Sequence, residues 1–163
     1  MANTTITNDK RAVFIDCSDA PHTAPAYARL GEGINTFTPS NNGQISTKHY
    51  INDKFATSRR NGLQKQFAFS GDRVIGDTAN DYLISLSEET GSACETTVII
   101  ADLINGSANK YPAKKYDCMI DISNDGAIEG GQDVTIDGTL YINGDPIEGF
   151  VTLTETGATW SVS

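Results

Sequence analysis

Acidic side chains are the groups in this sequence best spaced for chemistry. The segment Asp121-x-Ser123-x-Asp125-Gly126 places its oxygens as the first half of a calcium-binding loop does. Such a loop closes on a bidentate glutamate at its twelfth position, where this sequence has Gln132. We therefore expect no calcium site, and no other metal site.

Catalytic motifs are missing from the chain. It contains no GxxxxGK[ST], HExxH or GxSxG, and its two histidines, His22 and His49, have no Ser or Cys in a recognisable catalytic context. Asp133 and Asp137 lie on the polar face of a predicted strand, as solvated acids do. A glycosidase would also need aromatic platforms for sugars, and Trp160 is the single tryptophan. The sequence predicts a protein that is not an enzyme and uses no cofactor.

The cysteines do not predict a disulfide framework or a zinc site. Cys17, Cys94 and Cys118 are odd in number, widely spaced and without a CxxC pair. This pattern favours small, partly buried apolar residues over disulfides or zinc ligands.

Charge divides the chain into two unlike halves. Residues 1–82 hold nine Lys/Arg against eight Asp/Glu, whereas residues 83–163 hold three against thirteen. Affinity for phosphates comes from Lys and Arg, so such a chain is a poor nucleic-acid binder. The acids either form a solvated face or attract the unlike face of an identical subunit.

A length of 163 residues suits one domain. No apolar run approaches the roughly 18 residues that a membrane span needs, and residues 1–5 do not resemble a signal peptide. We expect a chain that is made and folded in a cytoplasm.

The elements that must position these residues centre on residues 61–91. Leu63, Phe67 and Phe69 share one face of a predicted strand, and Ser70-Gly71-Asp72 forms a turn. Asp77 or Thr78 can cap a helix over about 77–90 that ends at Gly91. A lone helix must cover a sheet built by the rest of the chain.

The remaining pattern is that of short strands. Apolar residues alternate at Tyr116, Cys118, Ile120 and Ile122 and again from Val134 to Ile142, and Asn143-Gly144 predicts a hairpin turn. We expect a mostly β fold, an antiparallel β-sandwich or partial barrel of about eight strands with one flanking helix.

Two segments do not fit a closed domain. Residues 1–25 are polar and irregular apart from Val13, Phe14 and Ile15, so they predict either an arm that pairs outside residues 26–163 or a loose terminus. Residues 52–62 are long for a hairpin connection and carry cations with a single aromatic ring. A loop of that kind usually binds something.

Two stretches resemble a known family. Residues 67–73 (FAFSGDR) followed by 76–83 (GDTANDYL) resemble the strand–turn–helix core of major tail tube proteins from long-tailed (siphovirus) phages. Residues 138–151 (GTLYINGDPIEGFV) look like the C-terminal hairpin of that family. The likeness covers roughly residues 26–162.

The resemblance implies a virion protein whose rings of six copies stack into a tube. The sheets of neighbouring subunits would join into one barrel around a lumen through which DNA passes without specific binding. Further partners would be tail proteins at the tube ends and a tape-measure protein in the lumen. Tubes of contractile tails or phage-derived bacteriocins are the alternative within this class, and an extracellular immunoglobulin-like binding module is the alternative outside it.

The resemblance also suggests roles for particular residues. The loop at 52–62 would contact the next ring through Lys54, Phe55, Arg59 and Arg60, and Val13, Phe14 and Ile15 would form an inter-subunit arm. Asp117, Asp121, Asp133 and Asp137 are candidates for an acidic lumen wall, or else they face bulk solvent.

Overall fold

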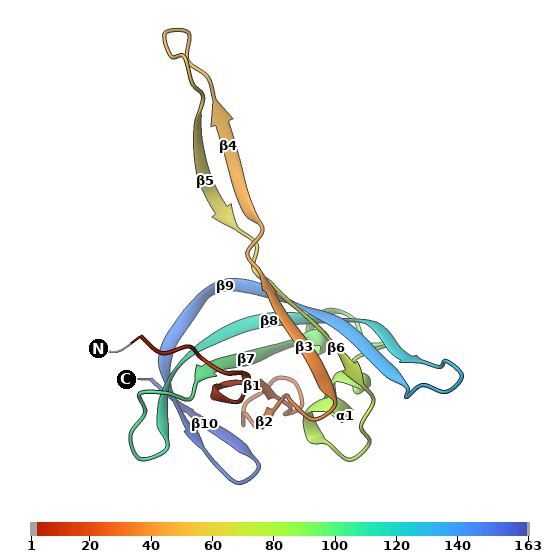
Figure 1. Cartoon of the computed structure of the whole chain (residues 1–163). Helices are drawn as coiled ribbons and strands as arrows, with labels where there is room; N and C mark the ends of the chain where they lie inside the picture. The colour runs from red at the N-terminus through yellow and green to blue at the C-terminus, as the bar shows by residue number, and fades with distance from the viewer. Residues whose placement is uncertain (1–2, 163) are drawn as a thin grey trace.

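Two long, bent strands run through the whole molecule. The structure is a computed structural model that describes residues 3–162, and β8 (Lys110–Ala127) pairs with β9 (Thr135–Leu153) along most of their lengths (Figure 1). The register between them shifts near Asp117 and near Asn124, and β-bulges of this kind bend a strand pair. Each strand can therefore serve two parts of the fold.

One part is a closed barrel. β1 (Arg11–Asp16), β2 (Tyr27–Arg29), β7 (Glu95–Asp102) and β10 (Gly157–Ser161) follow the order β10-β2-β1-β7-β8-β9, and β10 also pairs with β9. This last pairing closes six antiparallel strands on themselves.

The other part is an open sheet beside the barrel. β6 (Gln66–Asp72) pairs with the first half of β9, and β3 (Ile34–Ser40) pairs with β6. Together with the second half of β8, these strands form a four-stranded unit in the order β3-β6-β9-β8, which we call the extended sheet. The expected mostly β, antiparallel, partly barrel-like fold is confirmed.

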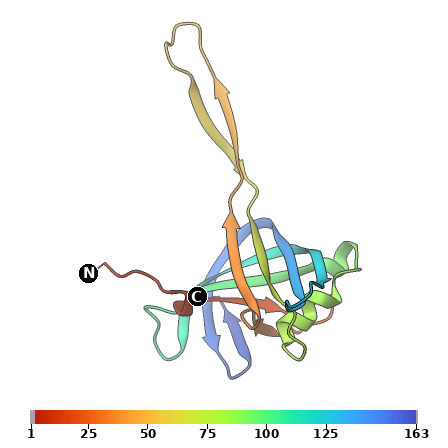
Figure 2. The same cartoon turned by 45° about the vertical axis from the view of Figure 1, so that its right-hand side comes forward.

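A two-stranded hairpin projects away from this body. β4 (Gly43–Lys48) and β5 (Thr57–Leu63) pair only with each other and continue from the end of β3 and the start of β6 (Figures 1 and 2). The loop expected at 52–62 is therefore half strand, because Arg59 and Arg60 belong to β5 while Lys54 and Phe55 lie at the tip.

The helix α1 (Thr78–Ser85), which is the single α-helix within residues 3–162, covers the inner face of the extended sheet. Asp77 caps it by accepting a hydrogen bond from the Asn80 N–H at 2.9 Å. It is shorter than the predicted 77–90, because the chain turns at Leu86 and then forms a 3₁₀ turn, η2 (Gly91–Cys94). A second 3₁₀ turn, η1 (Asn8–Lys10), precedes β1.

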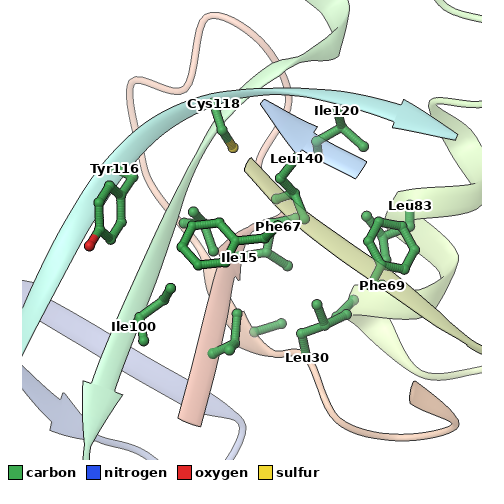
Figure 3. Packing of buried hydrophobic residues seen from close by; sticks show 14 of the residues in the cluster. Ile15, Leu30, Phe67, Phe69, Leu83, Ile100, Tyr116, Cys118, Ile120 and Leu140 are labelled. Carbon is green, nitrogen blue, oxygen red and sulfur yellow. The ribbon is translucent and has the colours of Figure 1, made fainter. Parts of the chain in front are cut away.

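The main core lies between the extended sheet, α1 and one side of the barrel. Figure 3 shows Phe67 and Phe69 of β6 beside Leu140 of β9 and Leu83 of α1. The predicted row Tyr116, Cys118 and Ile120 is buried there, and Ile122 is partly buried at its edge. A second cluster around Phe14, Ile99 and Val151 fills the space between β1, β7 and the second half of β9.

The expected N-terminal arm is wrong for residues 11–16. β1 pairs with β2 on one side and β7 on the other, so it is a central strand of its own chain. Val13, Phe14 and Ile15 are buried in the core because both faces of β1 are covered. The boundary expected at residue 25 is absent, since a strand on its N-terminal side completes the barrel.

The expected hairpin at Asn143-Gly144 is also wrong. β9 runs through these residues without reversing, and β8 pairs with it on both sides of them, through Asp117↔Asn143 and Lys115↔Ile147. Gly144, at φ +80°, supplies a bulge that bends the strand. The stretch 138–151 is one curved strand.

Candidate assembly surfaces

The outer face of the extended sheet is mostly polar. Paired residues of an antiparallel sheet share a face, and the pairs Ser70↔Asp137, Ala68↔Thr139 and Gln66↔Tyr141 continue onto β8 through Asp121 and Met119. β3 adds Thr36, Thr38 and Ser40 to the same face. None of these side chains is buried, although α1 covers the opposite face with core residues.

Three of the four candidate wall acids lie on this face. Asp117 and Asp121 are exposed on β8, and Asp137 on β9 accepts a hydrogen bond from Asn124 Nδ2 at 2.8 Å. Asp133 does not join them, because Gly130 and Gly131 carry a turn and β9 begins only at Thr135. Asp133 instead lies exposed at the end of the sheet.

The extended sheet has two edges without a partner strand in the described chain. β3 pairs with β6 alone. β7 stops pairing with β8 at Glu95↔Met119, so residues 120–127 of β8 pair only with β9. Both edges carry backbone N–H and C=O groups that can pair with another chain.

The hairpin is exposed over nearly all its length. Ile45 of β4 is 67 % exposed and Phe55 at the tip is 78 % exposed. Residues 43–63 carry Lys48, Lys54, Arg59 and Arg60 against a single acid, Asp53. A lone two-stranded hairpin is marginally stable in water, and its exposed apolar surface indicates a contact with a partner.

Two hydrogen bonds close the turn at the tip of the hairpin. The Asp53 N–H donates to the Tyr50 carbonyl at 3.1 Å, and His49 Nε2 lies 2.7 Å from the Asp53 carbonyl oxygen. His49 has a structural role here, since its ring closes the turn that carries Lys54 and Phe55.

The opposite end of the extended sheet is tied to α1 by a buried asparagine. Asn80 Oδ1 accepts hydrogen bonds from Arg73 Nη1 and the Val74 N–H, while its Nδ2 donates to the Asp72 carbonyl at 3.0 Å. Arg73 also forms a 2.6 Å ion pair with Asp81, and this interaction lowers the pKa of the Asp81 carboxyl. Sequence reasoning missed Asn80, because a polar residue on a short helix gives no signal that it is buried.

One cluster brings a serine, a histidine and an aspartate together. Asp16 is 1 % exposed and accepts hydrogen bonds from Ser18 and from the Ala26 N–H, and His22 Nδ1 lies 3.3 Å from its Oδ2. His22 Nε2 faces the Glu95 carbonyl at 2.8 Å, so neither ring nitrogen is free to act as a base. The cluster fixes the segment between β1 and β2 against β7.

Burial disfavours the reactive thiolate form of all three cysteines. Burial raises the pKa of both Cys17 and Cys118 to about 12, and it also raises the pKa of Cys94. Within residues 3–162, no three His, Cys, Asp or Glu side chains are grouped to hold a metal ion. None of the helices in that range has the length and apolar character needed to cross a membrane.

Comparisons with known proteins give structural neighbours only. No family model matches the sequence, and no curated protein matches it. The SPP1 tail tube is similar in structure, with a TM-score of 0.65 at 12 % identity over 98 % of this chain and 81 % of that chain. The tail of an empty GTA particle, refined with C6 symmetry, has a TM-score of 0.58 at 10 % identity over 87 % of this chain and 97 % of that one.

A contractile system has a similar subunit. A chain of the sheath–tube complex of PVC, an extracellular contractile injection system, has a TM-score of 0.50 at 8 % identity over 90 % of this chain and 93 % of that chain. The fold of this protein is therefore the fold of tail tube subunits, and the resemblance noted in the sequence is confirmed at the level of the fold.

Proposed function

We propose that this protein is the structural subunit of a phage tail tube, in which rings of six copies stack head to tail around a conduit for DNA. The observation that carries the proposal is the extended sheet with its two unpartnered edges, on a fold shared with tail tube subunits. The number six follows the C6 symmetry of the similar GTA particle tail.

Strand directions favour ring closure through the extended sheet. Its strands alternate in direction across β3-β6-β9-β8, so β3 runs opposite to β8. When β3 of one copy lies beside residues 120–127 of the next, the new junction is antiparallel like the others. Each copy then contributes four strands to one barrel, and no edge is left open.

The polar outer face would then line the lumen. Asp117, Asp121 and Asp137 face outward on it. Between Asp117 and Asp137, none of the residues that pair across this face is a Lys or Arg. Carboxylates repel DNA within about a Debye length, ~8 Å at physiological salt, whereas cations would bind its phosphates. A wall of this kind lets DNA pass without holding it.

The hairpin would connect successive rings. The hairpin extends beyond the body of the subunit (Figure 2), and its sequence includes Lys54, Phe55, Arg59 and Arg60. A head-to-tail contact that does not close generates a filament. This supports stacking of identical rings into a tube.

The location and the partners of the protein follow from this role. The protein would reside in the virion after synthesis in the host cytoplasm, with tail proteins at the tube ends and a tape-measure protein in the lumen as further partners. A contractile tail or a phage-derived bacteriocin is the second candidate, favoured by the similar subunit of the PVC sheath–tube complex. No structural neighbour of this kind favours an extracellular binding module.

Negative-stain electron microscopy of the purified chain over a range of concentrations tests the proposal. Hollow filaments of uniform diameter are expected at high concentration, with six-fold symmetry in end views. A chain that stays monomeric at every concentration and salt tested would overturn it.

A further inference from the structure

Exposed apolar side chains gather at two places on the molecule. Eleven large apolar side chains of the described residues are exposed, and five of them belong to the hairpin. Three more, Ile75, Ile128 and Val134, are 85 %, 85 % and 38 % exposed. Scattered exposed apolar residues are ordinary, but two groups of this kind suggest two halves of one contact.

The two groups lie at opposite ends of the extended sheet. The hairpin follows the end of β3 and precedes β6, whereas Ile75 follows the end of β6. Ile128 and Val134 flank the turn between the end of β8 and the start of β9. Because neighbouring strands are antiparallel, this turn and Ile75 share the end of the sheet that is farthest from the hairpin (Figure 1).

The charges of the two ends are opposite. Asp125, Glu129 and Asp133 are exposed beside the three apolar residues, and none of them lies within 4.0 Å of a cation in the described chain. Arg73, the cation at this end, is already engaged by Asp81 and Asn80. The hairpin segment 43–63 has four cations and one acid, a net charge of +3.

We call the residues Ile75, Asp125, Ile128, Glu129, Asp133 and Val134 the sheet-end patch. Hydrogen bonds hold it in place, since the Arg73 N–H donates to the Val134 carbonyl at 2.7 Å and the side-chain Oδ1 of Asn124 accepts from the N–H groups of Gly126 and Ala127. A surface held in this way loses little entropy on binding.

We propose that the sheet-end patch is the docking surface for the hairpin of a second copy of this chain, an inference that rests on the proposed tube function. The apolar side chains of the patch would contact those of the hairpin, and Glu129 and Asp133 would attract the hairpin cations, which include Arg59 and Arg60. A strand of about 11 residues spans roughly 35 Å, so the hairpin is long enough to reach past its own subunit. Opposite charges at the two ends orient each subunit head to tail and disfavour head-to-head contact.

Charge reversal and its rescue test this pairing. The hairpin variant is Arg59→Glu with Arg60→Glu, the patch variant is Glu129→Lys with Asp133→Lys, and the swap variant carries all four changes. We expect each double variant to raise the concentration needed for filaments at least about tenfold, because like charges then face each other. The swap variant restores opposite charges and should form filaments near the wild-type concentration.

A matched control reverses two exposed acids away from the patch, Asp19→Lys with Glu155→Lys, and should polymerise as the wild type does. Far-UV circular dichroism checks that every variant is folded. Filaments of the patch variant at the wild-type concentration, or a swap variant as defective as the two doubles, would overturn the pairing. Both outcomes leave the tube proposal intact, since that proposal fails only if the wild type forms no filaments.

Discussion

At the residue scale, the most constrained polar group is a carboxylate inside the barrel wall. Burial acts to raise the pKa of Asp16, but hydrogen bonds from Ser18 and Ala26 and the nearby His22 outweigh it, so the net pKa lies below the ordinary value of 3.8. Its backbone carbonyl also accepts a 2.7 Å hydrogen bond from Thr96 Oγ1. Asp16 therefore joins the β1–β2 connection to β7.

Asp16→Asn should lower the free energy of unfolding by about 2–3 kcal/mol at pH 7, because the charge-assisted hydrogen bonds to a buried group are weakened. A lowered native pKa stabilises the fold fully above pH 3.8, and this contribution disappears as the pH falls through the native value. Urea unfolding of both proteins from pH 7 to pH 3 should show their stability difference shrinking below pH 3.8. A difference that does not change with pH would exclude the charge of Asp16 as its source.

Residue patterns in the sequence show which side chains are buried better than they show where a strand begins or which residues meet in the fold. Alternation of apolar and polar types in one segment was enough to place Tyr116, Cys118 and Ile120 in the core. The same alternation predicts that four acids share one strand face, but Asp133 lies before the start of β9, because periodicity does not show where a strand begins. Asn80 could not be found, since its buried hydrogen bonds depend on residues brought near by the fold.

At the element scale, sequence reasoning gave the class of the fold but erred where strands bend or pair over long distances. Asn143-Gly144 is a turn signal, yet the pairing of β8 on both sides turned it into a bulge. β1 follows a polar segment and precedes Pro21 and Pro25, a pattern that suggests an arm, and only its pairing with the distant β7 makes it central. The sequence predicts a long loop at 52–62, although residues 57–62 belong to the exposed strand β5, because this strand lacks apolar alternation.

Replacing residues 42–64 with one glycine should leave the body folded. The resulting loop Asn41-Gly-Lys65 would connect Ser40 and Gln66, which are already paired, and three-residue loops with glycine close hairpins well. Lys65 keeps its place over the rings of Phe67 and Tyr116. Because β4 and β5 pair only with each other, the midpoint of thermal unfolding should change by no more than a few degrees.

The same variant should form no long filaments if the hairpin connects successive rings. Differential scanning calorimetry measures its stability, and electron microscopy beside the wild type measures its assembly. A stable variant that still makes long filaments would remove the hairpin from the stacking contact.

At the scale of the whole molecule, the fold combines a closed barrel, whose strands are all paired, with a sheet that has unpaired edges. The six-stranded barrel pairs every one of its strands on both sides, whereas the extended sheet ends at β3 and at residues 120–127 of β8. The sequence could not show this division, because an edge is a property of the pairing and each strand has an ordinary composition. It is the division that a ring-forming subunit requires.

Amide hydrogen exchange can locate the junction between copies. Pro39 has no N–H, so its pair with Phe67 cannot be a hydrogen-bonded one, and the antiparallel alternation then directs the Phe37 N–H away from β6 toward the free edge. This amide, together with the outward amides of residues 120–127, should exchange at least about tenfold more slowly in filaments than in monomers if edges pair across copies. Amides of β1, which lies between β2 and β7, should be protected in both states. Filaments in which both edges exchange as fast as in the monomer would mean that the rings are held by side-chain contacts alone, and that the lumen is not one continuous sheet.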